Sequence, residues 1–211
     1  MKKTFNNLLL SILAGIVISL GCLVFLLIPN NIIGAIFFTT GLFLVLTRGY
    51  NLFTGKVAYA IDNKISYTFQ LLITWIGNLI GSLLMVFAIK NTHLYNKISE
   101  RIANITDTKI TQGYLSALIL AILCGIIIFL AVENYKNNPH EIGKYLGLLF
   151  LIPLFIICNF EHCIADMFYF FINTENFLIK LTYIITITIG NSVGSIIANA
   201  IKKYKNKGDK G

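Results

Sequence analysis

Ile76-Gly-Asn-Leu-Ile-Gly-Ser82 and Ile189-Gly-Asn-Ser-Val-Gly-Ser195 are nearly the same sequence, with five of seven positions identical. Both stretches lie inside long apolar runs. A repeated motif of this kind indicates that the chain contains two copies of one structural unit. In membrane proteins built from such copies, the functional site lies where the copies meet, and each copy contributes a helix broken by polar residues. The two motifs therefore predict a duplicated membrane protein.

The composition supports a location within a membrane. The 211 residues are 56% hydrophobic and only 12% charged, whereas soluble domains are about 25% charged. A helix needs about 20 residues to cross the apolar part of a bilayer, and four runs reach that length, while two others are interrupted halfway. The six predicted crossings are Leu8–Ile28, Ile32–Leu46 with Leu52–Ile61, Phe69–Ile89, Tyr114–Val132, Tyr145–Phe160 with Ile164–Ile172, and Leu181–Ile201.

These crossings predict an all-α membrane protein with a single transmembrane domain over residues 1–211. The first copy covers about residues 8–89, and a polar linker over residues 90–112 joins it to the second copy, about residues 113–201. A lysine-rich tail, residues 202–211, follows and is expected to be disordered. Three crossings per copy is an odd number, so the second copy enters the membrane upside down relative to the first. The fold class is therefore six transmembrane helices as two inverted three-helix repeats with two broken helices.

The distribution of basic residues predicts the orientation. Six crossings place both termini on one side, and with the N-terminus inside, the inner segments hold ten basic residues against five in the outer segments. This bias favours cytoplasmic termini and a multi-pass protein of the cell membrane. The net charge of +8 then reflects orientation and lipid headgroups, and no nucleic-acid motif accompanies it. The first run is interpreted as a retained helix, because no small-residue cleavage site precedes Pro29.

Polar residues interrupt the second and fifth crossings. Between residues 47 and 56 the chain contains Arg48, Asn51 and Thr54, and between residues 159 and 166 it contains Glu161 and His162. Polar groups at this depth are costly and are functional candidates by default. Irregular backbone there is tolerated only if it is buried in protein or lines a cavity. Two such segments meeting from opposite sides predict a pore with its critical groups near the midplane.

The motifs in these breaks resemble those of the formate/nitrite transporter family. The matching stretches are Leu52-Phe-Thr-Gly55, Phe160-Glu-His-Cys-Ile-Ala165, Leu130-Ala-Val132 and the two Gly-Asn-x-x-Gly motifs. The resemblance extends from the first crossing to the last. It implies an aquaporin-like protomer that assembles as a homopentamer in the lipid bilayer and passes small monovalent anions.

The resemblance also implies roles for polar residues. His162 corresponds to the central histidine, which is expected to hydrogen-bond Thr54 at the pore centre, with Glu161 beside it. Lys109, at the mouth of the fourth crossing, corresponds to an anion-attracting lysine. Because imidazole titrates near neutral pH, His162 would share a proton with the anion of a weak acid. The alternatives are a helix–helix hydrogen bond for His162, an interfacial lysine for Lys109 and a helix cap for Thr54.

Three apolar residues are assigned to constrictions on the same basis. Phe38 and Leu42 fall where the family has an apolar constriction and the leucine that gates it, and Phe155 falls on the opposite constriction. Without the resemblance these residues would be interpreted as ordinary core. The amphipathic helix that precedes the first crossing in the family has no counterpart in the seven residues before Leu8, so we expect a channel that is constitutively open or regulated differently.

Two residues that differ from the family pattern are predicted to depend on each other. Lys56 and Asp166 stand where family members often have asparagine, and we predict that they form a buried ion pair. The rival interpretation is that Asp166, one helical turn from His162, raises the proton affinity of the histidine.

The leading hypothesis is therefore a channel for formate, nitrite or hydrosulfide. The alternatives are an aquaporin-like channel for neutral solutes and a membrane scaffold that transports nothing. Aquaporins need two Asn-Pro-Ala motifs, and none of the three prolines lies in that setting. No catalytic motif, cofactor site or metal-ligand spacing is evident, so an enzyme is not expected.

Overall fold

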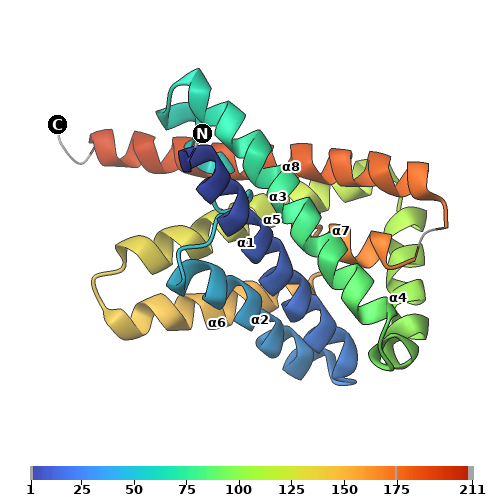
Figure 1. The fold of residues 1–211 in the computed structure, drawn as a ribbon. Coiled ribbons are helices and arrows are strands. Elements are labelled where there is room, and N and C mark those ends of the chain that lie inside the picture. Colours follow the sequence, from blue (N-terminus) through green and yellow to red (C-terminus); the bar gives the residue numbers. More distant parts are fainter. Residues whose placement is uncertain (1, 174, 209–211) are drawn as a thin grey trace.

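The computed structural model describes residues 2–173 and 175–208, and Figure 1 shows that this part of the chain is a helical bundle. In these ranges there are eight α-helices and one short 3₁₀ helix, with no strand. The elements are α1 (Lys2–Leu27), α2 (Asn31–Thr47), η1 (Val57–Asp62), α3 (Ile65–Lys90), α4 (Leu94–Thr111), α5 (Tyr114–Asn137), α6 (Glu141–Ile157), α7 (Cys163–Phe171) and α8 (Phe177–Gly208).

The two breaks begin with the same backbone turn. After α2, Gly49 has a φ of +67°, and after α6, Asn159 has a φ of +53°. Glycine and asparagine are the residues that best tolerate this left-handed conformation, which closes helix ends. In each turn the following amide donates to a carbonyl five residues back, from Tyr50 to Val45 and from Phe160 to Phe155, both at 2.9 Å. The corresponding positions, 49 and 159, are 110 residues apart.

The asparagine of the first repeated motif fixes the first break. Asn78 lies in α3 and is fully buried. Its side-chain oxygen accepts from the Phe53 amide at 2.9 Å, and its nitrogen donates to the carbonyls of Ser11 at 2.8 Å and Asn51 at 2.9 Å. One amide thereby joins α1, α3 and the irregular segment, and it satisfies backbone groups that no helix ladder pairs.

The asparagine of the second motif makes the matching set of bonds. Asn191 in α8 accepts from the Cys163 amide at 2.9 Å and donates to the carbonyls of Ala121 and Glu161, each at 2.8 Å. Its three partners lie 110 positions after those of Asn78 (11 and 121, 51 and 161, 53 and 163). The duplication inferred from the motifs is thus present in the hydrogen bonds, and α1–α2–η1–α3 corresponds to α5–α6–α7–α8.

The long helices of the two halves run in different directions in Figure 1. There α1 and α3 run toward the lower right, whereas α5 and α8 run toward the left. The described helices that are long and apolar enough to cross a membrane are Thr4–Leu27, Ile65–Lys90, Tyr114–Asn137 and Phe177–Lys205. The six-crossing count, in which each broken segment completes one more span, stays a prediction.

Two segments differ from the sequence expectation. The polar linker contains α4, an amphipathic helix whose Ile98, Ile102 and Thr106 are buried against the bundle. The tail expected to be disordered continues α8 as far as Gly208, while positions 209–211 lie outside the described residues. The backbone groups of both segments are hydrogen-bonded within helices. Because both segments are rich in polar residues, the apolar runs of the sequence do not predict these helices.

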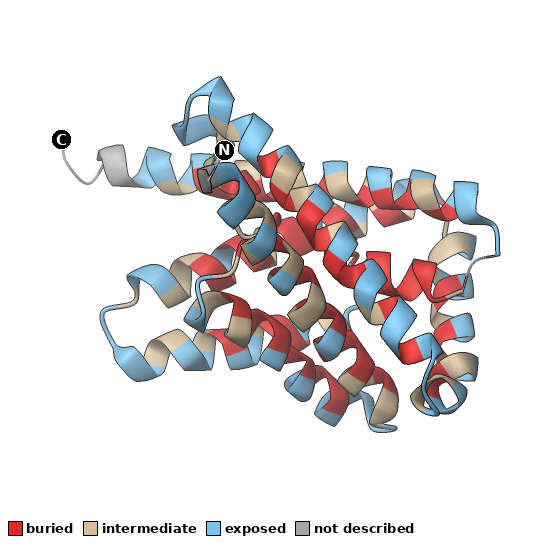
Figure 2. Cartoon of the chain, viewed as in Figure 1, coloured by how far each residue is buried: buried red, intermediate tan, exposed pale blue. Residues whose placement is uncertain are grey.

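Apolar side chains cover the outward faces of the helices. Figure 2 shows buried residues where helices face one another and exposed residues around the outside. Phe87 and Phe150 are each 71% exposed. Such extensive apolar surface is typical of contact with lipid or with other copies of a chain rather than with water.

Candidate functional site

His162 and Thr54 meet at the centre of the two breaks. Thr54 Oγ1 lies 2.8 Å from His162 Nε2, and both residues are at most 2% exposed. His162 is also the N-cap of α7, where its Nδ1 accepts from the Ala165 amide at 3.2 Å. Because an amide can only donate, Nδ1 carries no proton, so the ring is neutral with its proton on Nε2 and donates to Thr54. Thr54 bonds the histidine rather than capping η1, whose N-cap is Lys56.

Two cavities near this pair share no lining residue. The larger, about 350 Å³ and here called the Lys109 cavity, is lined by His162 and by residues of α4 and α6. The smaller, about 210 Å³ and here called the Lys56 cavity, is lined by residues of α2, the first break and α5. His162 thus lines the larger cavity, whereas Leu52 and Gly55, which are close to Thr54 in the sequence, line the smaller one.

Phe38 and Phe155 form one apolar collar next to His162. Their ring centroids are 5.7 Å apart in an edge-on arrangement, and the Phe155 ring is 5.9 Å from the imidazole. Both line the Lys109 cavity. The expectation that Phe155 belongs to a constriction opposite Phe38 is therefore wrong. The reason is that α2 and α6 pack side by side across the breaks, which brings the two rings into contact.

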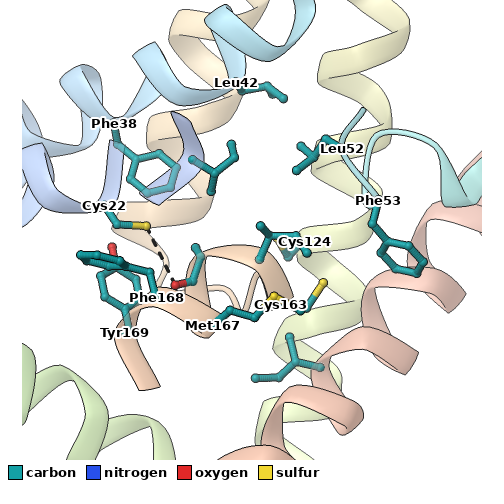
Figure 3. Packing of buried hydrophobic residues seen from close by; sticks show 14 of the residues in the cluster. Cys22, Phe38, Leu42, Leu52, Phe53, Cys124, Cys163, Met167, Phe168 and Tyr169 are labelled. Carbon is teal, nitrogen blue, oxygen red and sulfur yellow. Dashed lines mark hydrogen bonds between the residues drawn. The ribbon is translucent and has the colours of Figure 1, made fainter. Parts of the chain in front are cut away.

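Leu42 lies on the other side and contributes to the Lys56 cavity. Leu52, from the first break, and Val132, from α5, line the same space. Figure 3 shows Leu42 and Leu52 reaching toward a common region from two segments. Leu52 was assigned no role from the sequence. The sequence does contain a signal for such a role. Leu52 lies 110 residues before His162, so it occupies in the first copy the position that the histidine occupies in the second.

Lys109 lies between two carboxylates. Its Nζ is 2.5 Å from Glu161 Oε2 and 2.9 Å from Asp166 Oδ1. The side chains are 12%, 2% and 1% exposed, respectively, so Lys109 does not extend to a lipid surface as an interfacial lysine would. Gln112, another residue without an assigned role, donates to Glu161 Oε1 at 2.7 Å. A buried lysine with two acidic partners is neutralised locally, which weakens its attraction for a passing anion.

The predicted Lys56–Asp166 ion pair is wrong. Asp166 pairs with Lys109 and lines the Lys109 cavity, whereas Lys56 lines the other cavity together with Lys136. Positions 56 and 166 are counterparts, 110 residues apart. Inverted copies place counterparts at equivalent sites on opposite sides of the centre rather than in contact.

Comparison with known proteins identifies the family of the chain. A sequence model described as "Formate/nitrite transporter" matches residues 1–204. The chain belongs to the formate/nitrite transporter family. The family comprises channels and transporters rather than enzymes.

Relatives within the formate/nitrite transporter family are distant. The uncharacterized transporter YrhG of Bacillus subtilis is 32% identical over 151 residues, which is 66% of this chain and 56% of YrhG. The formate channel FocA of Escherichia coli K12 is 26% identical over 188 residues, which is 79% of this chain and 66% of FocA. The chain thus spans somewhat over half to two thirds of the length of these relatives.

Solved structures of the family share the fold. A structure described as a pentameric formate channel with formate bound superposes with a TM-score of 0.88 at 24% identity, covering 98% of both chains. A second, described as an FNT family ion channel, gives a TM-score of 0.83 at 18% identity and covers 96% of this chain and 90% of its own. The all-helical fold with two broken helices is therefore the fold of this family.

Proposed function

We propose that the chain is a channel for small monovalent anions of weak acids, of the formate, nitrite or hydrosulfide type, with a proton shared at His162. The observation that carries the proposal is the buried hydrogen bond of His162 with Thr54, in which the histidine also lines the Lys109 cavity. The relation to a formate channel and the fold shared with another support the substrate class.

The apolar collar gives a physical reason for sharing a proton with the anion at His162. An anion that passes between Phe38 and Phe155 loses its water, and an unpaired buried charge is far more costly than a neutral molecule. The Phe155 ring of the collar is 5.9 Å from the imidazole of His162, so an anion that passes the collar comes next to this side chain. A hydrogen bond at that point spreads the negative charge, and transfer of a proton removes it.

The proposal extends to assembly and orientation. We place the protein in the cell membrane as a homopentamer with both termini in the cytoplasm. The description of a solved neighbour as pentameric supports the oligomer number, and the exposed apolar helix faces supply surface for contacts between copies. The basic bias of the predicted inner segments supports the orientation.

The test is uptake of formate, nitrite and hydrosulfide into proteoliposomes across a range of pH. We expect uptake by the wild type that rises with acidity. His162→Asn and His162→Ala should lose or invert this pH dependence rather than only lower the rate. His93→Asn, an exposed histidine between α3 and α4, is the matched control and should behave as wild type.

The outcomes separate the competing functions. Unchanged pH profiles in both variants remove His162 from the mechanism and leave the channel in place. Swelling in glycerol without swelling in ammonium formate indicates a neutral-solute channel. No flux of any solute contradicts a transport function and favours a scaffold.

A further inference from the structure

The ion cluster in the Lys109 cavity has one cation and two carboxylates. Lys109 contacts both Glu161 and Asp166, and each carboxylate is nearly inaccessible to solvent. Two ionised carboxylates beside one ammonium group would leave a net negative charge buried in the protein. Like charges in a shared buried site do not both ionise readily, and one of them keeps its proton.

The hydrogen bonds show which carboxyl group is the better site for that proton. Both oxygens of Glu161 receive a donor, one from Lys109 at 2.5 Å and one from Gln112 at 2.7 Å. Asp166 receives Lys109 on Oδ1, whereas its Oδ2 has no hydrogen-bond partner among the described residues although it is buried. A carboxylate is stabilised by donors to both oxygens, so Glu161 is suited to the ionised form and Asp166 to the neutral acid.

We propose that Asp166 rests as the neutral acid with its proton on Oδ2, and that it donates this proton to the anion in the Lys109 cavity. The inference rests on the proposed channel function. In the step, the O–H bond of Asp166 breaks, an O–H or S–H bond forms on the anion, and the neutral acid proceeds past the collar. Asp166 is left as a carboxylate beside Lys109 until it takes a proton from a hydronium ion that enters the same cavity, which leaves water.

His162 is less able to supply that proton. Its Nδ1 accepts from the Ala165 amide and its Nε2–H donates to Thr54, so both nitrogens are already engaged. Asp166 is one turn further along the chain, with its amide donating to the His162 carbonyl at 2.9 Å, and it lines the same cavity. The histidine can thus orient the anion while Asp166 supplies the proton.

Other ionisable groups surround Asp166. They are Cys22 from α1, Arg101 and Lys109 from α4, Cys124 from α5, Glu161 and His162 from the second break, and Cys163 and Tyr169 from α7. Arg101 is occupied by the α1–α2 turn, where it donates to the carbonyls of Leu26 and Ile28. Lys109 is shared between Glu161 and Asp166 Oδ1, which leaves Asp166 Oδ2 as a buried carboxyl oxygen without a partner among the described residues, on a side chain that lines the Lys109 cavity.

Infrared spectroscopy of the full chain in lipid tests the protonation directly. At neutral pH we expect a protonated-carboxyl C=O band that shifts when aspartate is labelled with ¹³C at its carboxyl group and that changes again when formate is added. Asp166→Asn should abolish the band. Asp107→Asn, at an exposed position of α4, should keep it. Absence of the band, or a band insensitive to the aspartate label, overturns the proposal without any variant.

Transport supplies the second readout. Because general acids typically accelerate proton transfer by about 10²–10⁴-fold, Asp166→Asn should lower formate uptake at neutral pH by at least about tenfold and flatten its pH profile. Glu161→Gln should remove the competing negative charge, so that Asp166 ionises beside Lys109 and the infrared band is lost. A wild type that passes formate while Asp166→Asn keeps its rate and pH profile overturns this inference alone. A wild type that passes no anion contradicts the proposed function itself.

Discussion

At the scale of single residues, two buried amides organise the site. Asn78 and Asn191 each bond one backbone amide and two carbonyls, and each set includes the irregular segment of its own half. The second set holds Glu161 and Cys163, the two neighbours of His162. The position of the imidazole therefore depends on an asparagine in α8, 29 residues further along the chain.

Removing either amide should destabilise the protein. Asn78→Ala or Asn191→Ala leaves backbone groups buried without partners, at a cost of about 2–4 kcal/mol in the free energy of unfolding. Thermal unfolding in detergent measures the change. Asn96→Ala, at an exposed position of α4, is the control and should stay near wild type. Wild-type stability of both core variants would contradict the bridging role of these amides.

At the scale of the elements, close helix pairs hold each half together. A Cβ added at Gly15 would overlap the backbone of Asn78, and one added at Gly125 would overlap the backbone of Asn191. The pairs α1–α3 and α5–α8 therefore approach until backbones touch, which only glycine permits. This approach also brings each asparagine within reach of the neighbouring helix.

Gly125→Ala should separate α5 from α8. The clash is with backbone rather than with a movable side chain, and overpacking of this kind costs about 1–3 kcal/mol. Gly55→Ala is the matched control, because its added Cβ would meet Val132 Cγ2 at 3.5 Å, an ordinary contact. Thermal stability in detergent distinguishes the two. Equal stability of the two variants would show that α5 and α8 accommodate the added methyl group without a loss of stability.

The end of α8 is tied to η1 by a pair that responds to pH. Lys203 donates to Asp62 Oδ1 at 2.5 Å and Asn199 donates to Oδ2 at 2.7 Å, and these bonds hold the pKa of Asp62 below its ordinary value of 3.8. A carboxyl pKa that is lower in the folded state gives a stabilisation that is complete above 3.8 and is lost as the pH falls below it.

Asp62→Asn should therefore lower stability at neutral pH and have no effect at a pH well below 3.8. Because the Lys203 side chain is 48% exposed, the loss at neutral pH should be under about 1 kcal/mol. Unfolding of wild type and variant at the two pH values is the measurement. A difference that persists in acid would assign the effect to something other than the charge of Asp62.

At the scale of the whole molecule, the fold leaves apolar faces that a single protomer does not cover. Helices of both halves carry exposed phenylalanines and leucines on their outer sides (Figure 2). We expect native mass spectrometry from detergent to give five copies of the 23.6 kDa chain. A monomer that conducts anions in lipid would contradict the pentamer and leave the protomer pore in place.

Much of this architecture was predictable because local patterns carry it. Long apolar runs predicted the spanning helices, and the repeated Gly-Asn motif predicted two copies whose asparagines occupy equivalent positions. The amphipathic α4 was not predicted, because its buried residues Ile98 and Ile102 are separated in the sequence by polar residues and form no apolar run. The charge pairing was also missed. Lys56 and Asp166 looked complementary in sequence, but the inverted repeat separates them.

The sequence by itself determined the membrane location, the duplication and the family, since hydrophobic length and motif spacing are local properties of the chain. Only the tertiary structure decided that Lys109 is held by Glu161 and Asp166, that Phe38 meets Phe155, and that one oxygen of Asp166 is left without a partner. These contacts join residues more than 50 positions apart, and their geometry depends on how the two halves pack.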